Sequence, residues 1–161
     1  MRFFKSFRYA FRGIVYCINN ERNMRFHTVA ALYVLVFSAF FGLSRAEYGV
    51  LFLTVAGVMA AEMFNTVAEE LSDMAAASFH PVVRIIKDMA AGGVLICALF
   101  AAAAGVCLFW RPAAWGGIFQ FFARNPAMLA LLIVTAALSA VFVAMGPLGI
   151  RDFIIRKRRD R

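Results

Sequence analysis

The sequence predicts an all-α integral membrane protein, with an N-terminal amphipathic surface helix, three transmembrane helices and a fourth, C-terminal transmembrane helix. The first observation is the composition: 63% of the residues are hydrophobic and 16% are charged, and the mean hydropathy is +0.78. Soluble domains average only about 45–50% apolar residues. The second observation is that all but three of the seventeen Lys and Arg residues flank the apolar runs on the sides that the positive-inside rule assigns to the cytoplasm.

The first half of the chain contains a surface helix and two spans. Residues 1–22 place basic and aromatic side chains at helical spacing, which favours a helix lying in the cytoplasmic interface. A first span of about residues 26–43 needs some tilt to cross roughly 30 Å of hydrocarbon. A tight external turn at 44–47 leads into a second span, 48–73, which is longer than a bilayer requires, so its last turns should reach the cytoplasmic interface.

The second half contains two further spans. The third covers about residues 83–109, with Pro81 in the first turn of its helix. Residues 111–125 form an external linker rich in aromatic side chains, as is typical of a membrane interface. An additional transmembrane helix, 126–148, carries no ionisable residue, and 149–161 form a basic cytoplasmic tail. Four spans place both termini in the cytoplasm.

Several function classes are excluded by the sequence. The basic residues serve topology and attract anionic lipid, so we expect no nucleic-acid partner. The three cysteines lack metal-ligand spacing and are interpreted as small apolar residues in the packing. No signal peptide is evident. No Walker motif, Gly-rich phosphate loop or HExxH motif is present, which excludes a soluble kinase fold.

The second span contains polar side chains on one face. At 100° per residue, Glu62, Asn65, Glu69 and Asp73 fall within about 80° of arc. A charged side chain at the bilayer centre costs roughly 2.5–3.5 kcal/mol on insertion scales. We call Glu62, Asn65, Glu69 and Asp73 the polar ladder. The cost of burying its charges indicates that the polar ladder has a partner: a cation, a metal or a polar substrate.

The predicted topology brings Glu21, this ladder and the Lys87-Asp88 pair to the cytoplasmic membrane surface. Carboxylates and a lysine at one depth suit a divalent cation with a phosphate substrate, because Mg²⁺ is typically held by one or two carboxylates plus phosphate oxygens. A further carboxylate could accept a proton from a hydroxyl group. By pattern alone, catalysis and structural polar packing between helices are equally supported.

Two motifs make the chain recognisable. Residues 62–69 read ExxNTxxE, and residues 80–92 read HPxxxxxKDxAAG; upstream, residues 6–13 and the Asn20-Glu21 pair fit the same pattern. Over roughly residues 1–110 the chain closely resembles the small membrane-embedded diacylglycerol kinase/undecaprenol kinase family. The resemblance implies a lipid kinase domain over 1–110 that forms a homotrimer, with composite active sites between protomers at the cytoplasmic face.

The resemblance also implies roles for individual residues. Glu62 occupies the position of the catalytic base that takes the proton from the lipid hydroxyl, and Asn65 that of the amide that organises the site. Glu21 and Glu69 match the two carboxylates that hold Mg²⁺ bound to ATP. The remaining matches are nucleotide contacts: Lys87 and Asp88 near the ATP phosphates, His80 in a nucleotide-contacting loop, and Arg2 and Tyr9 on the surface helix.

The expected reaction is ATP-dependent phosphorylation of a membrane lipid alcohol in the bacterial inner membrane. The Asn23-x-Arg25-x-His27 pattern and His80-Pro81 resemble the undecaprenol kinase branch, which makes undecaprenyl phosphate. The alternatives are a diacylglycerol kinase that makes phosphatidic acid, and a non-catalytic lipid-binding or transport subunit. We further expect Asp73 to pair with a neighbouring base and Glu70 to be solvated. The fourth span goes beyond the family minimum of three and has no assigned catalytic role.

Overall fold

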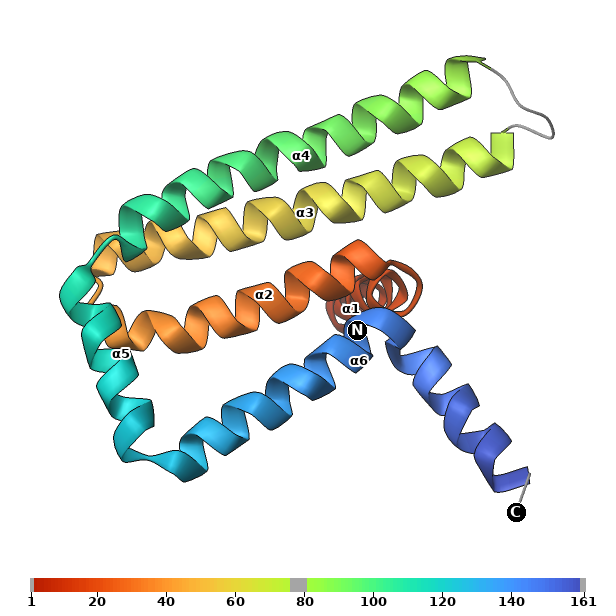
Figure 1. The fold of residues 1–161 in the computed structure, drawn as a ribbon. Helices are drawn as coiled ribbons and strands as arrows, with labels where there is room; N and C mark the ends of the chain where they lie inside the picture. Colours follow the sequence, from red (N-terminus) through yellow and green to blue (C-terminus); the bar gives the residue numbers. More distant parts are fainter. Residues whose placement is uncertain (1, 76–80, 160–161) are drawn as a thin grey trace. The chain divides into compact units, whose positions relative to one another are not determined.

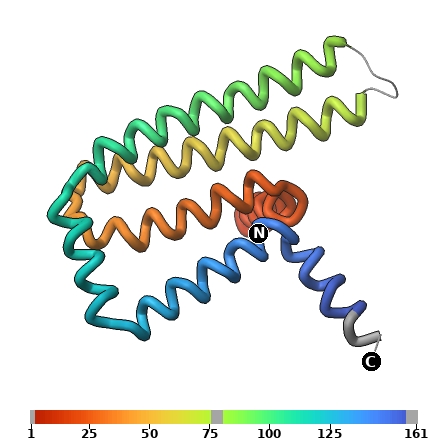
Figure 2. Tube along the Cα trace, in the orientation of Figure 1, coloured from red at the N-terminus to blue at the C-terminus, as the bar shows by residue number. Residues whose placement is uncertain are grey.

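The computed structural model describes residues 2–75 and 81–159, and these residues are helical with short connections and contain no strand. Figures 1 and 2 show the path of the chain. The elements are α1 (Arg2–Asn20), α2 (Arg22–Ser38), the short 3₁₀ helix η1 (Ala39–Phe41), α3 (Arg45–Ala75), α4 (Pro81–Phe109), α5 (Pro112–Arg124) and α6 (Pro126–Arg159).

Within residues 2–75 and 81–159, four helical segments are long and apolar enough to cross a membrane: Arg22–Phe41, Arg45–Ala75, Pro81–Phe109 and Pro126–Arg156. Most of their large apolar side chains are exposed within the single chain, as expected where lipid or another protein surrounds a helix. The prediction of an all-α membrane fold with an N-terminal helix and four spans is confirmed.

The chain divides into two compact units. The first comprises residues 1–29 and 122–161, and the second comprises residues 30–121. In the second unit α3 and α4 lie side by side over most of their lengths, as both ribbon and tube show (Figures 1 and 2). In the first unit α1 packs against α6.

The start of α3 is fixed by a capping box. The backbone N–H of Ser44 donates to Oε2 of Glu47 at 2.7 Å, and the backbone N–H of Glu47 donates to Oγ of Ser44 at 3.3 Å. This reciprocal pair satisfies two donors at a helix N-terminus. Gly42 precedes it in the left-handed conformation (φ 56°, ψ 44°), which glycine adopts without steric cost. The predicted external turn at 44–47 is therefore the first turn of α3 together with its N-cap.

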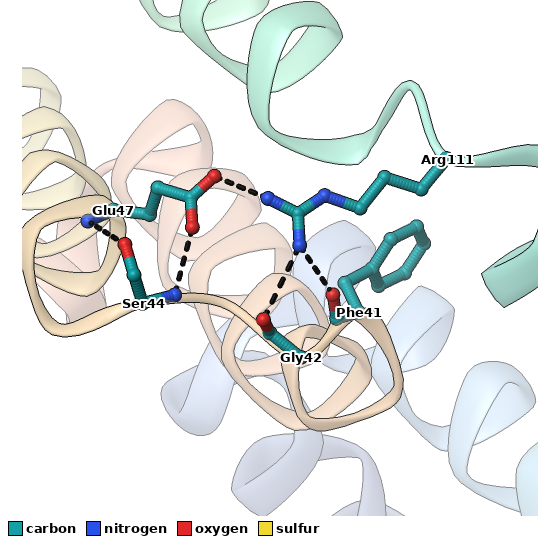
Figure 3. A network of polar contacts seen from close by, with 5 residues as sticks. All are labelled: Phe41, Gly42, Ser44, Glu47 and Arg111. Atoms are coloured by element: carbon teal, nitrogen blue, oxygen red, sulfur yellow. Dashed lines mark hydrogen bonds and ion pairs between the residues drawn. The ribbon is translucent and has the colours of Figure 1, made fainter.

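Arg111 ties this turn to the end of α4. Its Nη1 donates to the carbonyl oxygens of Phe41 at 2.7 Å and Gly42 at 3.2 Å, and its Nη2 forms an ion pair with Glu47 (Figure 3). The guanidinium group offers several donors in a fixed plane, so one side chain can bind both carbonyls and the carboxylate. The α2–α3 connection is thus held to the α4–α5 connection within the second unit.

The aromatic linker contains a helix, α5. Phe41 packs edge-on against Phe109 (ring centroids 4.8 Å apart) and Trp115 (5.2 Å), and Phe40 packs against Phe121 (5.3 Å). Edge-to-face aromatic pairs contribute about 0.5–1.5 kcal/mol each beyond the area they bury. These contacts hold η1 to both α4 and α5.

Helix α6 is bent where the sequence predicted an end. Gly146 has non-helical backbone angles (φ 68°, ψ 170°), and Pro147 follows it. The helix then resumes and continues to Arg159, because proline is well tolerated in the first turn of a helix. The segment expected as a basic tail is therefore helical up to Arg159.

Candidate active site

The polar ladder of the second span lies on α3, and its centre is buried. The exposed fraction is 1% for Glu62, 6% for Asn65 and 2% for Thr66. Both carboxylate oxygens of Glu62 are shielded from solvent, and its backbone carbonyl accepts a bond from Oγ1 of Thr66 at 3.1 Å. Burying a carboxylate is costly, so its retention inside a membrane helix marks a candidate functional position.

Asn65 and Glu69 form a pair one helical turn apart. Nδ2 of Asn65 donates to Oε1 of Glu69 at 2.9 Å. Glu69 is half-buried, whereas Glu70 beside it is exposed, as expected. Because Asn65 donates its amide to the carboxylate, it fixes the orientation of the Glu69 side chain. Among the described residues, no hydrogen-bond partner is found for Oδ1 of Asn65.

Lys87 connects α4 to the end of the ladder. Its Nζ forms an ion pair with Oδ1 of Asp73, so the two helices are bridged where α3 ends and α4 begins. The expectation that Asp73 pairs with a neighbouring base is confirmed. The neighbouring Asp88 lies 3.9 Å from Nε of Arg84, and both of these side chains are more than 70% exposed. Such an exposed pair contributes little to stability.

The other predicted site residues belong to the first unit or are not described. The backbone of Arg2 begins α1, and Tyr9 is exposed on the same helix, with the Arg12 guanidinium 5.9 Å from its ring centroid. Glu21 occupies the junction between α1 and α2, where its N–H donates to the carbonyl of Cys17 at 2.8 Å. His80 lies outside the described residues.

The donor chemistry suits a hard cation together with a phosphate substrate. Within the described ranges, no group of three or more His, Cys, Asp or Glu side chains is placed to hold a metal ion. Oxygen ligands from one or two carboxylates are the usual protein contribution to a magnesium–nucleotide site, where phosphate oxygens and water complete the shell. Glu69, oriented by Asn65, offers such a ligand.

Arg25 is a buried residue to which the sequence reasoning gave no structural role. It is 7% exposed, and its guanidinium binds only backbone carbonyls among the contacts that the structure records. Its position near the start of the first span was visible in the sequence, but its acceptors lie as far away as residue 143.

The fold and these residues define a helical membrane protein with one buried carboxylate (Glu62) and a buried amide (Asn65) on α3, and a lysine (Lys87) on the neighbouring α4. Comparison with known proteins identifies the class further. The sequence model of the family described as "Prokaryotic diacylglycerol kinase" matches residues 8–109, well over half of the chain. The chain belongs to this family.

Two curated relatives are each 38% identical over 108 residues. One is the undecaprenol kinase of Bacillus subtilis (strain 168); the alignment covers 67% of this chain and 88% of the relative. The other is the diacylglycerol kinase of Synechocystis sp. (strain ATCC 27184 / PCC 6803 / Kazusa); the alignment covers 66% of this chain and 62% of the relative. The protein is therefore a lipid kinase that uses ATP as co-substrate, and the alternative of a non-catalytic subunit is set aside.

Proposed function

We propose that the protein phosphorylates undecaprenol with ATP and makes undecaprenyl phosphate. The observation that carries the kinase part of the proposal is the buried carboxylate of Glu62 on the same helical face as the Asn65–Glu69 pair. The choice of undecaprenol is supported by the name of the Bacillus subtilis relative. Glu69 lies seven positions after Glu62, which is about 10 Å along a helix axis at 1.5 Å per residue. A phosphoryl group can be accommodated between a proton acceptor and a metal-binding carboxylate at that spacing.

In this proposal Glu62 is the general base. Its carboxylate takes the proton of the lipid hydroxyl as the hydroxyl oxygen attacks the γ-phosphorus of ATP. The new O–P bond forms while the bond from the γ-phosphorus to the β,γ-bridging oxygen breaks, and ADP leaves. The buried position supports this role, because it keeps bulk water away from the carboxylate that is to receive the proton.

The remaining roles concern the nucleotide. Glu69, oriented by Asn65, would hold Mg²⁺ together with Glu21, and a bound Mg²⁺ would neutralise charge on the transferring phosphoryl group. Lys87 would neutralise phosphate oxygens, which requires it to exchange Asp73 for the nucleotide. Asp88, His80, Arg2 and Tyr9 would supply further nucleotide contacts.

We also propose a homotrimer in the bacterial inner membrane, with residues 1–110 as the kinase domain and both termini in the cytoplasm. The many exposed apolar side chains on α3 and α4 support helix–helix or helix–lipid contacts beyond the single chain. The basic residues that flank the spans support the orientation.

The second candidate substrate is diacylglycerol, which the name of the Synechocystis relative favours. The purified protein in mixed micelles with Mg-ATP distinguishes the two lipids. We expect a higher kcat/KM with undecaprenol than with diacylglycerol at equal mole fraction. Equal or greater activity with diacylglycerol would overturn the choice of lipid while leaving the kinase mechanism in place.

A further inference from the structure

The side chain of Arg25 connects two helices of the first unit. Its Nε donates to the carbonyl oxygen of Val143 in α6 at 3.1 Å. Its Nη1 donates to the carbonyl oxygens of Ile18 at 3.3 Å and Asn19 at 3.1 Å, both in the last turn of α1. The arginine is buried, so these three bonds form where competing water is scarce.

The bend in α6 creates the acceptor that Arg25 uses. In a continuous helix the N–H of residue 147 would donate to the carbonyl of residue 143, but Pro147 has no N–H to donate. Gly146 supplies the second condition, which is space. A Cβ at this position would lie 2.8 Å from Nη1 of Arg25. The backbone φ of 68° is also one that residues other than glycine rarely adopt. Pro147 thus leaves the carbonyl of Val143 free to accept from Arg25, and Gly146 leaves room for the guanidinium.

Besides α6, Arg25 binds the end of α1, next to Glu21. Glu21 follows α1 directly, two residues after Asn19, and its backbone carbonyl accepts the N–H of Arg25 at 3.2 Å. Arg25 therefore holds the junction through its backbone and through its side chain. Movement of α6 away from Arg25 would break the bond to Val143, which ties the guanidinium to α6, and would leave only the two bonds to the end of α1.

We propose that Arg25 is a positioning residue, and that α6 acts through it to hold Glu21 in place for the magnesium nucleotide. The inference rests on the proposed role of Glu21. It gives the C-terminal helix a function, although α6 lies beyond the residues that the family model matches. The fourth span would then be a brace for the α1–α2 junction.

The test uses the full-length protein in micelles and a matched pair of proline variants on α6. Pro147→Ala restores an N–H that can satisfy Val143 and compete with Arg25. Pro126→Ala, at the exposed first position of the same helix, is the control. At a temperature at which all variants remain folded, Pro147→Ala should raise the Mg²⁺ concentration for half-maximal activity about tenfold, as expected for loss of one charge-assisted bond. Its kcat at saturating Mg²⁺ should stay within about twofold, and Pro126→Ala should match the wild type.

A second measurement does not depend on activity. The unfolding temperatures of Arg25→Lys, Pro147→Ala and the double variant form a double-mutant cycle. We expect the double variant to be no less stable than the weaker single variant, because both changes remove the same contact. If Pro147→Ala fails to fold, Gly146→Ala replaces it in the cycle, because its methyl group would displace Arg25 from the same contact.

The outcomes separate this inference from the proposed function. Additive losses of unfolding temperature would show that Arg25 and the bend are independent, and would overturn the proposal. Coupled unfolding temperatures with an unchanged Mg²⁺ requirement would overturn the positioning role. An inactive wild-type protein would refute the proposed function and the positioning role together, whereas the stability cycle would still report on the contact itself.

Discussion

The substitution Arg111→Met tests how the second unit is held together at the end of α3 that lies opposite the polar ladder. It keeps a long apolar stem and removes the donors to Phe41 and Gly42 and the partner of Glu47. Hydrogen bonds to charged groups contribute about 1.5–3 kcal/mol each. The 2.7 Å bond to the buried Phe41 carries most of this, whereas the 3.2 Å bond to Gly42 is weaker.

The ion pair with Glu47 adds less, because both side chains are about one-third exposed and such pairs contribute about 0–1 kcal/mol. Glu47 also keeps its capping bond to Ser44 when Arg111 is lost. The total is about 2–3 kcal/mol, which corresponds to a fall in unfolding temperature of about 4–12 °C for a chain of this size.

The assay is thermal unfolding of the purified protein in detergent, followed by circular dichroism. Arg124→Met is the matched control, since Arg124 is exposed at the end of α5. A surface change of this kind should alter stability by no more than about 0.5 kcal/mol. Equal shifts for the two variants, or a shift below about 1 °C for Arg111→Met, would show that Arg111 does not hold the two connections together.

Further predictions concern the site. Asn65→Ala should raise the KM for Mg-ATP about tenfold by freeing Glu69 from its 2.9 Å bond; steady-state kinetics measure it, and an unchanged KM would contradict the role of the pair. Lys87→Gln should lower kcat strongly, whereas Asp73→Asn should retain most of it, because in the proposed mechanism Lys87 exchanges Asp73 for the nucleotide. The reverse order would exclude Lys87 from the phosphates. Chelation of divalent cations should abolish turnover and added Mg²⁺ should restore it, and turnover that persists in excess chelator would remove the metal from the mechanism.

Much of the fold could be predicted because each helix carries its own signal. The apolar runs of α3 and α4 are long enough to predict both helices. Residues 44–47 were interpreted as an external turn, although Ser44 and Glu47 form a capping box and α3 already begins at Arg45. The helical character of residues 112–124 was not predicted, because the belt of aromatic residues indicated an interface and not a conformation. Contacts of Phe41 with Trp115 hold this helix in place, and such contacts join residues far apart in sequence.

The candidate site was predictable to the extent that it lies on one helix. Glu62, Asn65 and Glu69 share a face by spacing alone, and the Asn65–Glu69 bond follows from their separation of four residues. Predicting the Lys87–Asp73 pair would have required knowing how α3 and α4 are aligned with each other, because the two residues lie on different helices. The bond from Arg25 to Val143 was beyond sequence reasoning, because it depends on the local bend at Gly146 and on tertiary packing.

The role of Glu62 as the base is tested by the turnover of Glu62→Gln beside that of Glu70→Gln in a lipid kinase assay with Mg-ATP. The two residues lie on the same helix, but Glu62 is buried whereas Glu70 is exposed. The account predicts that Glu62→Gln loses at least about a hundredfold in kcat, as expected for removal of a general base, while its oligomeric state and folding are unchanged. It predicts nearly wild-type turnover for Glu70→Gln. Wild-type turnover in Glu62→Gln would contradict the claim that this buried carboxylate accepts the proton of the lipid hydroxyl.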